Sequence, residues 1–228
     1  EKGLNIKPSE KNNFEIEEFD KDEFIKLNVI GNGSSSLVYL SYHIKKRELF
    51  VIKVFKENND DDYSKLIERE IKNYQKIDFP LLPKFYGKIK NMNSFVIQII
   101  DGETLLDIEE NKLNLEDSVF IILELILIIE YLHAKHFVYR DLKPNNVIID
   151  ENKSIYVIDF DRMINNDNNT NHTADFQLGF ASPEVSSGQV TYESDIYSLG
   201  KMVSHITKDT VENGIKNSYQ ILITKCIK

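Results

Sequence analysis

The sequence predicts an α+β protein with a small β-rich lobe followed by a larger, mainly α-helical lobe. The first observation is a series of short runs typical of strands before Gly102, at residues 24–31, 36–43, 49–55 and 94–100. The second is the change to helical patterning beyond Gly102. In a protein with two such lobes, a ligand is expected in the cleft between them.

The remaining elements follow in chain order. A charged stretch from Ser64 to Ile77 interrupts the first lobe and predicts a helix, because its apolar residues recur at helical spacing. A strand pair is predicted in the second lobe, at 146–150 and 154–159. The predicted domain organisation is an acidic N-terminal extension at 1–22, an N-lobe at 23–101, and a C-lobe at 102–228 that looks shortened at its end.

Composition and charge restrict the function classes. The chain has 228 residues and a net charge of −9, which argues against a nucleic-acid binder and gives no support to docking on anionic lipid. Its single cysteine, Cys226, excludes an internal disulfide framework and is typical of the reducing cytoplasm, so a cytoplasmic location is expected. The N-terminus has no apolar run and predicts no signal peptide. The oligomeric state is left open.

The run VFIILELILIIEYL at 119–132 is apolar enough to suggest a membrane span. It is too short for one, and Glu124 and Glu130 interrupt it. We therefore predict a helix buried in a globular core, and no membrane span in this chain.

The densest chemical signal is the string YRDLKPNN at 139–146, followed by IDFD at 158–161. Phosphoryl transfer from ATP needs positioning, metal ions that neutralise phosphate charge, and a carboxylate aimed at the acceptor hydroxyl. Asp141 offers such a carboxylate. Asn146 and Asp159 offer the hard oxygen ligands that suit Mg²⁺, and Lys143 can reach the transferring phosphate.

These strings resemble the HRDLKPxN catalytic loop and the DFG motif of the eukaryotic-like protein kinase family, and the resemblance runs from about residue 24 to residue 200. It implies a two-lobe kinase fold and a serine/threonine protein kinase that uses ATP with Mg²⁺ or Mn²⁺ and acts on a protein with a Ser/Thr acceptor. By this resemblance Asp141 is the catalytic base and Lys143 contacts phosphate, while Asn146 and Asp159 bind the metal. Lysine at position 143 resembles serine/threonine kinases in particular.

Upstream, the string GNGSSSLV at 31–38 lies between two predicted strands, and its glycines let the backbone approach phosphate closely. Taken alone, the string is also typical of an ordinary hairpin, and Lys53 of a solvated strand lysine. The string VIK at 51–53 resembles the family's VAIK motif. In that context the turn resembles the glycine-rich loop over ATP, and Lys53 is implied to pair with the α- and β-phosphates.

The predicted helix at 64–77 supplies a candidate partner for Lys53. Helical spacing places Glu70 beside the apolar stripe of this helix. Taken alone, Glu70 is one of many surface charges on an amphipathic helix. By the resemblance it is the helix glutamate that forms an ion pair with Lys53. Glu68 is the alternative, and Glu70 is preferred because it aligns with the family's REI text.

Residues 97–102, IQIIDG, resemble the hinge that binds adenine through backbone groups, with Ile97 at the gatekeeper position. The apolar residues above and below the adenine ring would equally suit an ordinary core. The predicted ATP-binding set is Ile30, Gly31, Gly33, Val38, Val51, Lys53, Ile97, Gln98, Ile100, Asn146, Ile148 and Asp159. The predicted catalytic set is Asp141, Lys143, Lys53 and Glu70.

Later motifs extend the resemblance. SPE at 182–184 resembles the family's APE motif, and SDIYSLG at 194–200 resembles the start of its helix F. The second match implies that Asp195 is a buried carboxylate that holds the backbone of the catalytic loop. Four aromatic residues match the apolar stack that links the two lobes in the family: Tyr74, Phe85, Tyr139 and Phe160.

Several residues depart from the family pattern. Tyr139 replaces histidine, and Asp161 replaces the glycine of DFG, which removes backbone freedom beside Asp159. The family's C-terminal helices and the arginine that pairs with the APE glutamate are not evident, so Glu184 is expected to lack its usual partner. Ser218–Lys228 resembles only the beginning of that region. Three further departures are Ser36 for the third loop glycine, Val51 for alanine, and Gln177 for threonine.

Thr170 and Thr173 lie in the segment that corresponds to the family's activation segment, and Arg140 precedes the predicted base. A phosphate on either threonine could pair with Arg140 and order this segment. We therefore hypothesise autophosphorylation at Thr170 or Thr173.

Two alternatives stay open beside an active protein kinase. A pseudokinase, meaning a nucleotide-binding or scaffolding module without turnover, is favoured by Asp161, by Gln177 and by the short C-terminal end. A kinase-like phosphotransferase acting on small molecules is the other, although such enzymes usually lack the DLKPxN text. The active kinase is preferred because all six chemical groups occur together, namely Lys53, Glu70, Asp141, Lys143, Asn146 and Asp159.

Overall fold

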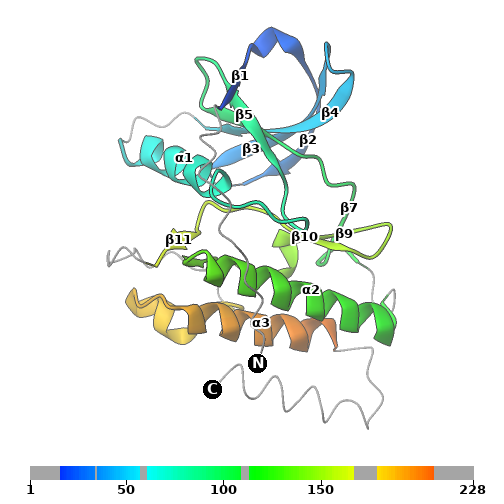
Figure 1. Cartoon of the computed structure of the whole chain (residues 1–228), viewed down its shortest axis with the longest axis vertical. Helices are drawn as coiled ribbons and strands as arrows, with labels where there is room; N and C mark the ends of the chain where they lie inside the picture. The colour runs from blue at the N-terminus through cyan, green and yellow to red at the C-terminus, as the bar shows by residue number, and fades with distance from the viewer. Residues whose placement is uncertain (1–15, 34, 57–60, 109–112, 167–178, 208–228) are drawn as a thin grey trace, which may run out of the picture.

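The computed structural model describes residues 16–33, 35–56, 61–108, 113–166 and 179–207. Figure 1 shows a six-stranded sheet with helix α1 (Asp61–Tyr74) at one end of the molecule, and helices α2 (Leu115–Ala134) and α3 (Tyr192–Ile206) at the other. Smaller sheets lie between these two parts. This arrangement confirms the predicted α+β fold with a β-rich lobe followed by a helical lobe.

The large sheet has the strand order β1-β5-β6-β4-β3-β2. Successive side chains of its central strands point to opposite faces, and both faces are buried: one packs on the helical part, and the other holds a separate cluster that includes Phe50 and Ile52. The strands are β1 (Glu17–Phe19), β2 (Phe24–Asn32), β3 (Ser36–His43), β4 (Glu48–Phe55), β5 (Phe85–Ile89) and β6 (Ser94–Ile97), with a short 3₁₀ helix at Lys21–Glu23.

Strand β1 lies inside the stretch that the sequence assigns to an N-terminal extension. It pairs in parallel with β5, and the Phe19 side chain is buried in the same cluster as Phe50. Residues 17–19 therefore belong to the sheet, although their sequence, Glu-Glu-Phe, has no strand signal of its own. The other predicted domain boundaries stay predictions.

Helix α1 begins and ends three residues earlier than predicted. Its buried residues include Ile67, Glu70, Ile71 and Tyr74, whereas Glu68 is exposed. The apolar face of the helix therefore packs against the sheet, as the periodicity predicts.

The helical part begins at β7 (Gly102–Thr104), which pairs with β9 (Val147–Asp150). A Cβ atom on Gly102 would lie 2.1 Å from the carbonyl oxygen of Ile149, so only glycine allows the two strands this close. The other elements are β8 (Phe137–Val138), β10 (Ile155–Val157), β11 (Ile164–Asn165) and 3₁₀ helices at Pro144–Asn146 and Pro183–Ser187.

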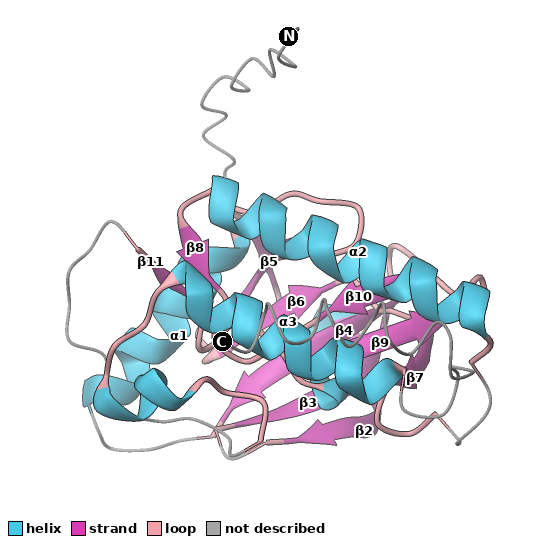
Figure 2. Cartoon of the chain, turned by 90° about the horizontal axis from the view of Figure 1, so that it is seen from below, coloured by secondary structure: helices cyan, strands magenta, loops and turns pink. Residues whose placement is uncertain are grey.

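Helix α2 is capped by Asn114, the residue before its first turn, whose side chain accepts from the backbone N–H of Asp117. Figure 2, a view from below, shows α2 and α3 side by side in front of the strands. The predicted burial of this helix holds for one face, where Ile121, Leu125, Ile128 and Leu132 are fully buried, but a stripe of Phe120, Leu123 and Leu127 is exposed. In the described part of the chain, no helix combines the length and apolarity needed to cross a membrane.

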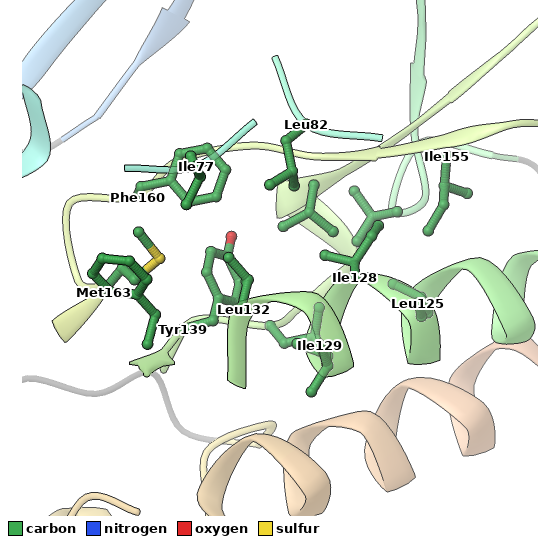
Figure 3. Close-up of a cluster of buried hydrophobic side chains, with 14 of the residues drawn as sticks. Ile77, Leu82, Leu125, Ile128, Ile129, Leu132, Tyr139, Ile155, Phe160 and Met163 are labelled. Atoms are coloured by element: carbon green, nitrogen blue, oxygen red, sulfur yellow. The ribbon is translucent and has the colours of Figure 1, made fainter. Parts of the chain in front are cut away.

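The core that joins the two parts is shown in Figure 3. Leucines and isoleucines on the inner face of α2 meet Ile155 of β10, and Tyr139 and Phe160 lie beside them. The core therefore includes the aromatic residues of both predicted catalytic segments, so packing fixes those segments.

Candidate active site

Lys53 lies on β4 with its side chain pointing into the helical side of the sheet. Its Nζ atom donates to Glu70 Oε1 at 2.8 Å and to Asp159 Oδ1 at 2.9 Å. Burial alone would lower the pKa of Lys53, but the Glu70 and Asp159 carboxylates outweigh it and raise that pKa, so the ammonium stays charged. One cation thus joins the sheet, helix α1 and the segment after β10.

Of the two candidate glutamates, the structure places Glu70 against Lys53. Burial raises the pKa of Glu70 to about 7, and the neighbouring Lys53 opposes that rise. Glu68 lies on the exposed side of α1, where it pairs with Lys72 at 3.3 Å.

The polar side chains of residues 141–146 lie close together. The only regular element in this segment is the 3₁₀ helix Pro144–Asn146. Lys143 Nζ donates to Asp141 Oδ2 at 2.8 Å. The amide nitrogen of Asn146 donates to the Asp141 carbonyl at 2.9 Å and to its Oδ2 atom at 2.8 Å. Arg162 Nε lies 3.9 Å from the same carboxylate, a contact that the sequence did not predict.

Asp159 lies close enough to Lys143 of this segment for the two charges to interact. Burial alone would raise the pKa of Asp159, but Lys53, the backbone N–H of Asp161 and Lys143 outweigh it and lower that pKa. Asp159 therefore carries a charge between the two lysines. Burial, with the Asp159 charge adding to it, raises the pKa of Asp161, so the substituted glycine position holds a second, less acidic carboxyl group.

Asp195 supports the catalytic-loop backbone, which confirms the predicted structural role. Its carboxylate is fully buried and accepts from the backbone N–H groups of Tyr139 and Arg140, both at 2.8 Å. His133 Nε2 also lies 2.8 Å from it. Arg140 has φ 73°, an unfavourable backbone conformation for a non-glycine residue, which the Asp195 bonds help to hold.

The predicted aromatic stack is also confirmed. Tyr74 stacks on Phe85 with ring centroids 6.0 Å apart, and meets Phe160 edge-on at 4.8 Å. Phe160 in turn contacts Tyr139 at 5.9 Å. The Tyr139 hydroxyl donates to the Ile158 carbonyl at 2.5 Å, so the tyrosine that replaces histidine links the catalytic loop to the residue before Asp159.

The predicted adenine-binding residues of the sheet share a face. Cross-strand pairing sets Val38 opposite Lys53 and Val51 opposite Ile97. Ile148 is half-buried on β9, across from Thr104.

The predicted phosphate turn overlaps the end of β2 and the start of β3, with Ile30 exposed and Gly31 opposite Val38. Lys56 Nζ donates to the Gly33 carbonyl at 2.6 Å and to Asn32 Oδ1 at 3.1 Å. This lysine ties the turn to the end of β4, a contact for which the sequence has no signal.

Gln98 and Ile100, predicted to contact adenine, line a cavity of about 550 Å³. The turn between β9 and β10 forms its other wall. Its lining includes none of Lys53, Asp141, Asn146 or Asp159, so it lies beside the hinge and away from the charged cluster.

Glu184 was expected to lack its usual arginine partner; in the structure its Oε1 atom accepts from Ser194 Oγ at 3.1 Å. Several predicted positions lie outside the described residues: Thr170, Thr173, Gln177 and Ser218–Lys228 with Cys226.

Comparison with known proteins agrees with this geometry. The pattern of the family described as "Protein kinase domain" matches residues 24–225. A carbon catabolite-derepressing protein kinase from Candida glabrata is 31% identical over 180 residues, which cover 75% of this chain and 29% of that protein. Its counterpart from Saccharomyces cerevisiae is 30% identical, with 75% and 28% covered. The serine/threonine-protein kinase PrkC from Bacillus subtilis is 29% identical, with 76% and 28% covered.

The two lobes and the charged cluster between them define a protein of the kinase class. The chain belongs to the protein kinase domain family, and its architecture is the two-lobe fold of that family. It spans less than a third of the length of these three curated relatives, at 28–29%.

Proposed function

We propose that this chain transfers the γ-phosphate of ATP to serine or threonine hydroxyls of protein substrates. The observation that carries the proposal is the position of Lys53, which donates to Glu70 at 2.8 Å and to Asp159 at 2.9 Å. Asp141, with Lys143 and Asn146 bonded to it, belongs to the same charged cluster. Phosphoryl transfer depends on a correctly positioned nucleotide and on charges held in place around its phosphates. The hydrogen bonds of Lys53 hold three such charges in fixed positions.

Each predicted residue takes a role in this proposal. Asp141 is the base that accepts the proton of the substrate hydroxyl, with Lys143 beside it to contact the transferring phosphate. Lys53 binds the α- and β-phosphates and is oriented by Glu70. The sheet residues and the hinge, from Ile30 to Ile100 in the predicted set, hold the nucleotide.

The donor set fits Mg²⁺, or Mn²⁺ in its place. Asn146 commits its amide nitrogen to Asp141, so its amide oxygen is the atom offered to a cation. The ionised carboxylate of Asp159 adds a second hard oxygen, and Mg²⁺ prefers a few such ligands completed by phosphate and water. When bound, the metal would neutralise charge on the transferring phosphate.

The acceptor and the location are also parts of the proposal. Lys143 in the DLKPNN string and the printed description of PrkC as a serine/threonine-protein kinase support a serine or threonine acceptor on a protein. The single cysteine in a chain with no disulfide framework supports a cytoplasmic location.

A phosphotransfer assay with Mg·ATP and a generic protein acceptor tests the proposal. Asp141→Asn should lower incorporation by about a hundredfold or more, because it removes the base. The matched control is Asp78→Asn, which makes the same change at an exposed position and should leave the rate unchanged. Chelation of divalent metal should abolish incorporation. Equal incorporation by both variants would remove Asp141 from its role, and nucleotide binding without any transfer would favour a binding module.

A further inference from the structure

The backbone that carries Asp159 has a conformation that needs support from its surroundings. Between β10, which ends at Val157, and β11, which begins at Ile164, the chain forms no regular element. Asp159 has φ 68°, in the left-handed region that non-glycine residues rarely adopt. Such a conformation persists only where neighbouring groups hold it.

Asn73 of α1 supplies part of that support. This side chain is only 5% exposed, and its amide nitrogen donates to the carbonyl oxygens of Phe160 at 3.1 Å and of Met163 at 2.8 Å. An amide nitrogen has two protons, so both are used. The two bonds lie on either side of residues 161–162 and close this part of the chain into a fixed turn.

Two arginines bind the carbonyls between those of Phe160 and Met163. Arg69 Nη2, also on α1, donates to the Asp161 carbonyl at 2.6 Å. Arg140 Nη1, in the catalytic loop, makes a longer bond of 3.4 Å to the Arg162 carbonyl. All four consecutive carbonyls from 160 to 163 therefore accept from side chains, and α1 provides the donors for three of them.

The two donors of α1 share a side of the helix with Glu70 and Tyr74. Glu70, Asn73 and Tyr74 follow Arg69 by one, four and five positions, which brings all four residues to one side of a helix. Glu70 reaches Asp159 through Lys53, and Tyr74 packs edge-on against Phe160. Helix α1 thus contacts the Asp159 segment through charge, through an aromatic ring and through backbone hydrogen bonds.

We infer that Asn73 is a positioning residue, which fixes the Asp159 carboxylate for metal-bound nucleotide by holding the backbone on its C-terminal side. The inference rests on the proposed function, in which Asp159 binds the metal. Asn73 touches neither nucleotide nor metal in this role. Through Asn73, the geometry of the metal site depends on the position of α1. This link is separate from the one made by the Glu70–Lys53 pair.

Two measurements on the full chain test the inference, with three variants at one position. Asn73→Leu is close in size and donates nothing, and Asn73→Asp presents a carboxylate to two carbonyls. Asn73→Ser keeps one donor and is the mildest of the three changes. It keeps the test possible if the other two variants do not fold. Lys72→Ala, on the exposed side of the same helix, is the matched control.

The first measurement is hydrogen exchange of the backbone amides between 158 and 164. Asn73→Leu and Asn73→Asp should speed exchange there by about tenfold or more, Asn73→Ser by less, and Lys72→Ala not at all. The second is calorimetric binding of ADP with and without Mg²⁺. Asn73→Leu should reduce the metal-dependent gain in ADP affinity by about tenfold and leave metal-free ADP binding unchanged. A purely structural role would weaken both kinds of binding alike.

Unchanged exchange in all three Asn73 variants overturns the inference. Faster exchange with an unchanged metal-dependent gain also overturns it, because Asn73 would then hold the segment without placing Asp159. If the wild-type chain shows no metal-dependent ADP binding, the proposed function fails instead, and the exchange measurement still decides whether Asn73 holds this backbone.

Discussion

Replacing Asp195 should destabilise the fold through the catalytic loop. The buried carboxylate accepts two backbone N–H groups at 2.8 Å and contacts His133 at the same distance. Asp195→Ala leaves the N–H groups of Tyr139 and Arg140 buried without an acceptor. An unpaired buried donor costs about 1–3 kcal/mol, and the lost bonds were made to a charged group, so we expect a loss of about 3–5 kcal/mol.

Urea denaturation followed by circular dichroism measures this loss, and a thermal melt checks it. For a chain of this size, about 2–4 °C of Tm corresponds to each kcal/mol, so Tm should fall by about 6–20 °C. Asp195→Asn keeps one acceptor oxygen and should cost less than the alanine variant. The control is Glu193→Ala, an exposed carboxylate in the first turn of the same helix, which should cost less than about 1 kcal/mol. An Asp195→Ala loss no larger than that of the control would refute the reasoning.

Three further variants test other parts of the structure. Lys53→Met removes the cation that opposes the rise in the pKa of Glu70 to about 7. A raised carboxyl pKa gives stability that is present at low pH and lost as pH rises, so urea titrations should find this variant more destabilised relative to wild type at pH 8 than at pH 6. Gly102→Ala places a Cβ atom 2.1 Å from the Ile149 carbonyl, and calorimetry should show a loss of about 1–3 kcal/mol. Phe160→Ala opens the aromatic stack and should cost about 3–5 kcal/mol by denaturant titration, whereas a loss below about 1 kcal/mol would place the ring outside the core.

Most of the fold could be predicted because its strands and helices carry local patterns. β3 has the predicted bounds, since aliphatic and aromatic residues that favour strands fill most of residues 36–43. β6 ends at Ile97 instead of continuing to Ile100, although the N–H of Gln98 still bonds to the Lys84 carbonyl next to β5. β1 was missed, since its pairing depends on Phe19 reaching a pocket formed by distant residues.

Part of the candidate site could be predicted from the sequence and part could not. Motif residues could be named from the sequence, and the structure sets Lys53, Glu70 and Asp159 within hydrogen-bond distance, while their catalytic roles stay predictions. Arg69 and Asn73 could not be found, because a polar residue on a helix gives no indication of a backbone partner about ninety positions later. The hydroxyl of Ser194, which donates to Glu184, could not be predicted either, because the sequence does not show which polar group a carboxylate will contact.

The tyrosine at position 139 also changes how this protein should respond to acid. A histidine in that place would gain a proton as pH falls below about 6.5. Burial raises the pKa of the Tyr139 hydroxyl well above its usual range, so this group keeps its proton throughout the acidic and neutral range. Its bond to the Ile158 carbonyl therefore joins the two loops equally well in mildly acidic and in neutral surroundings.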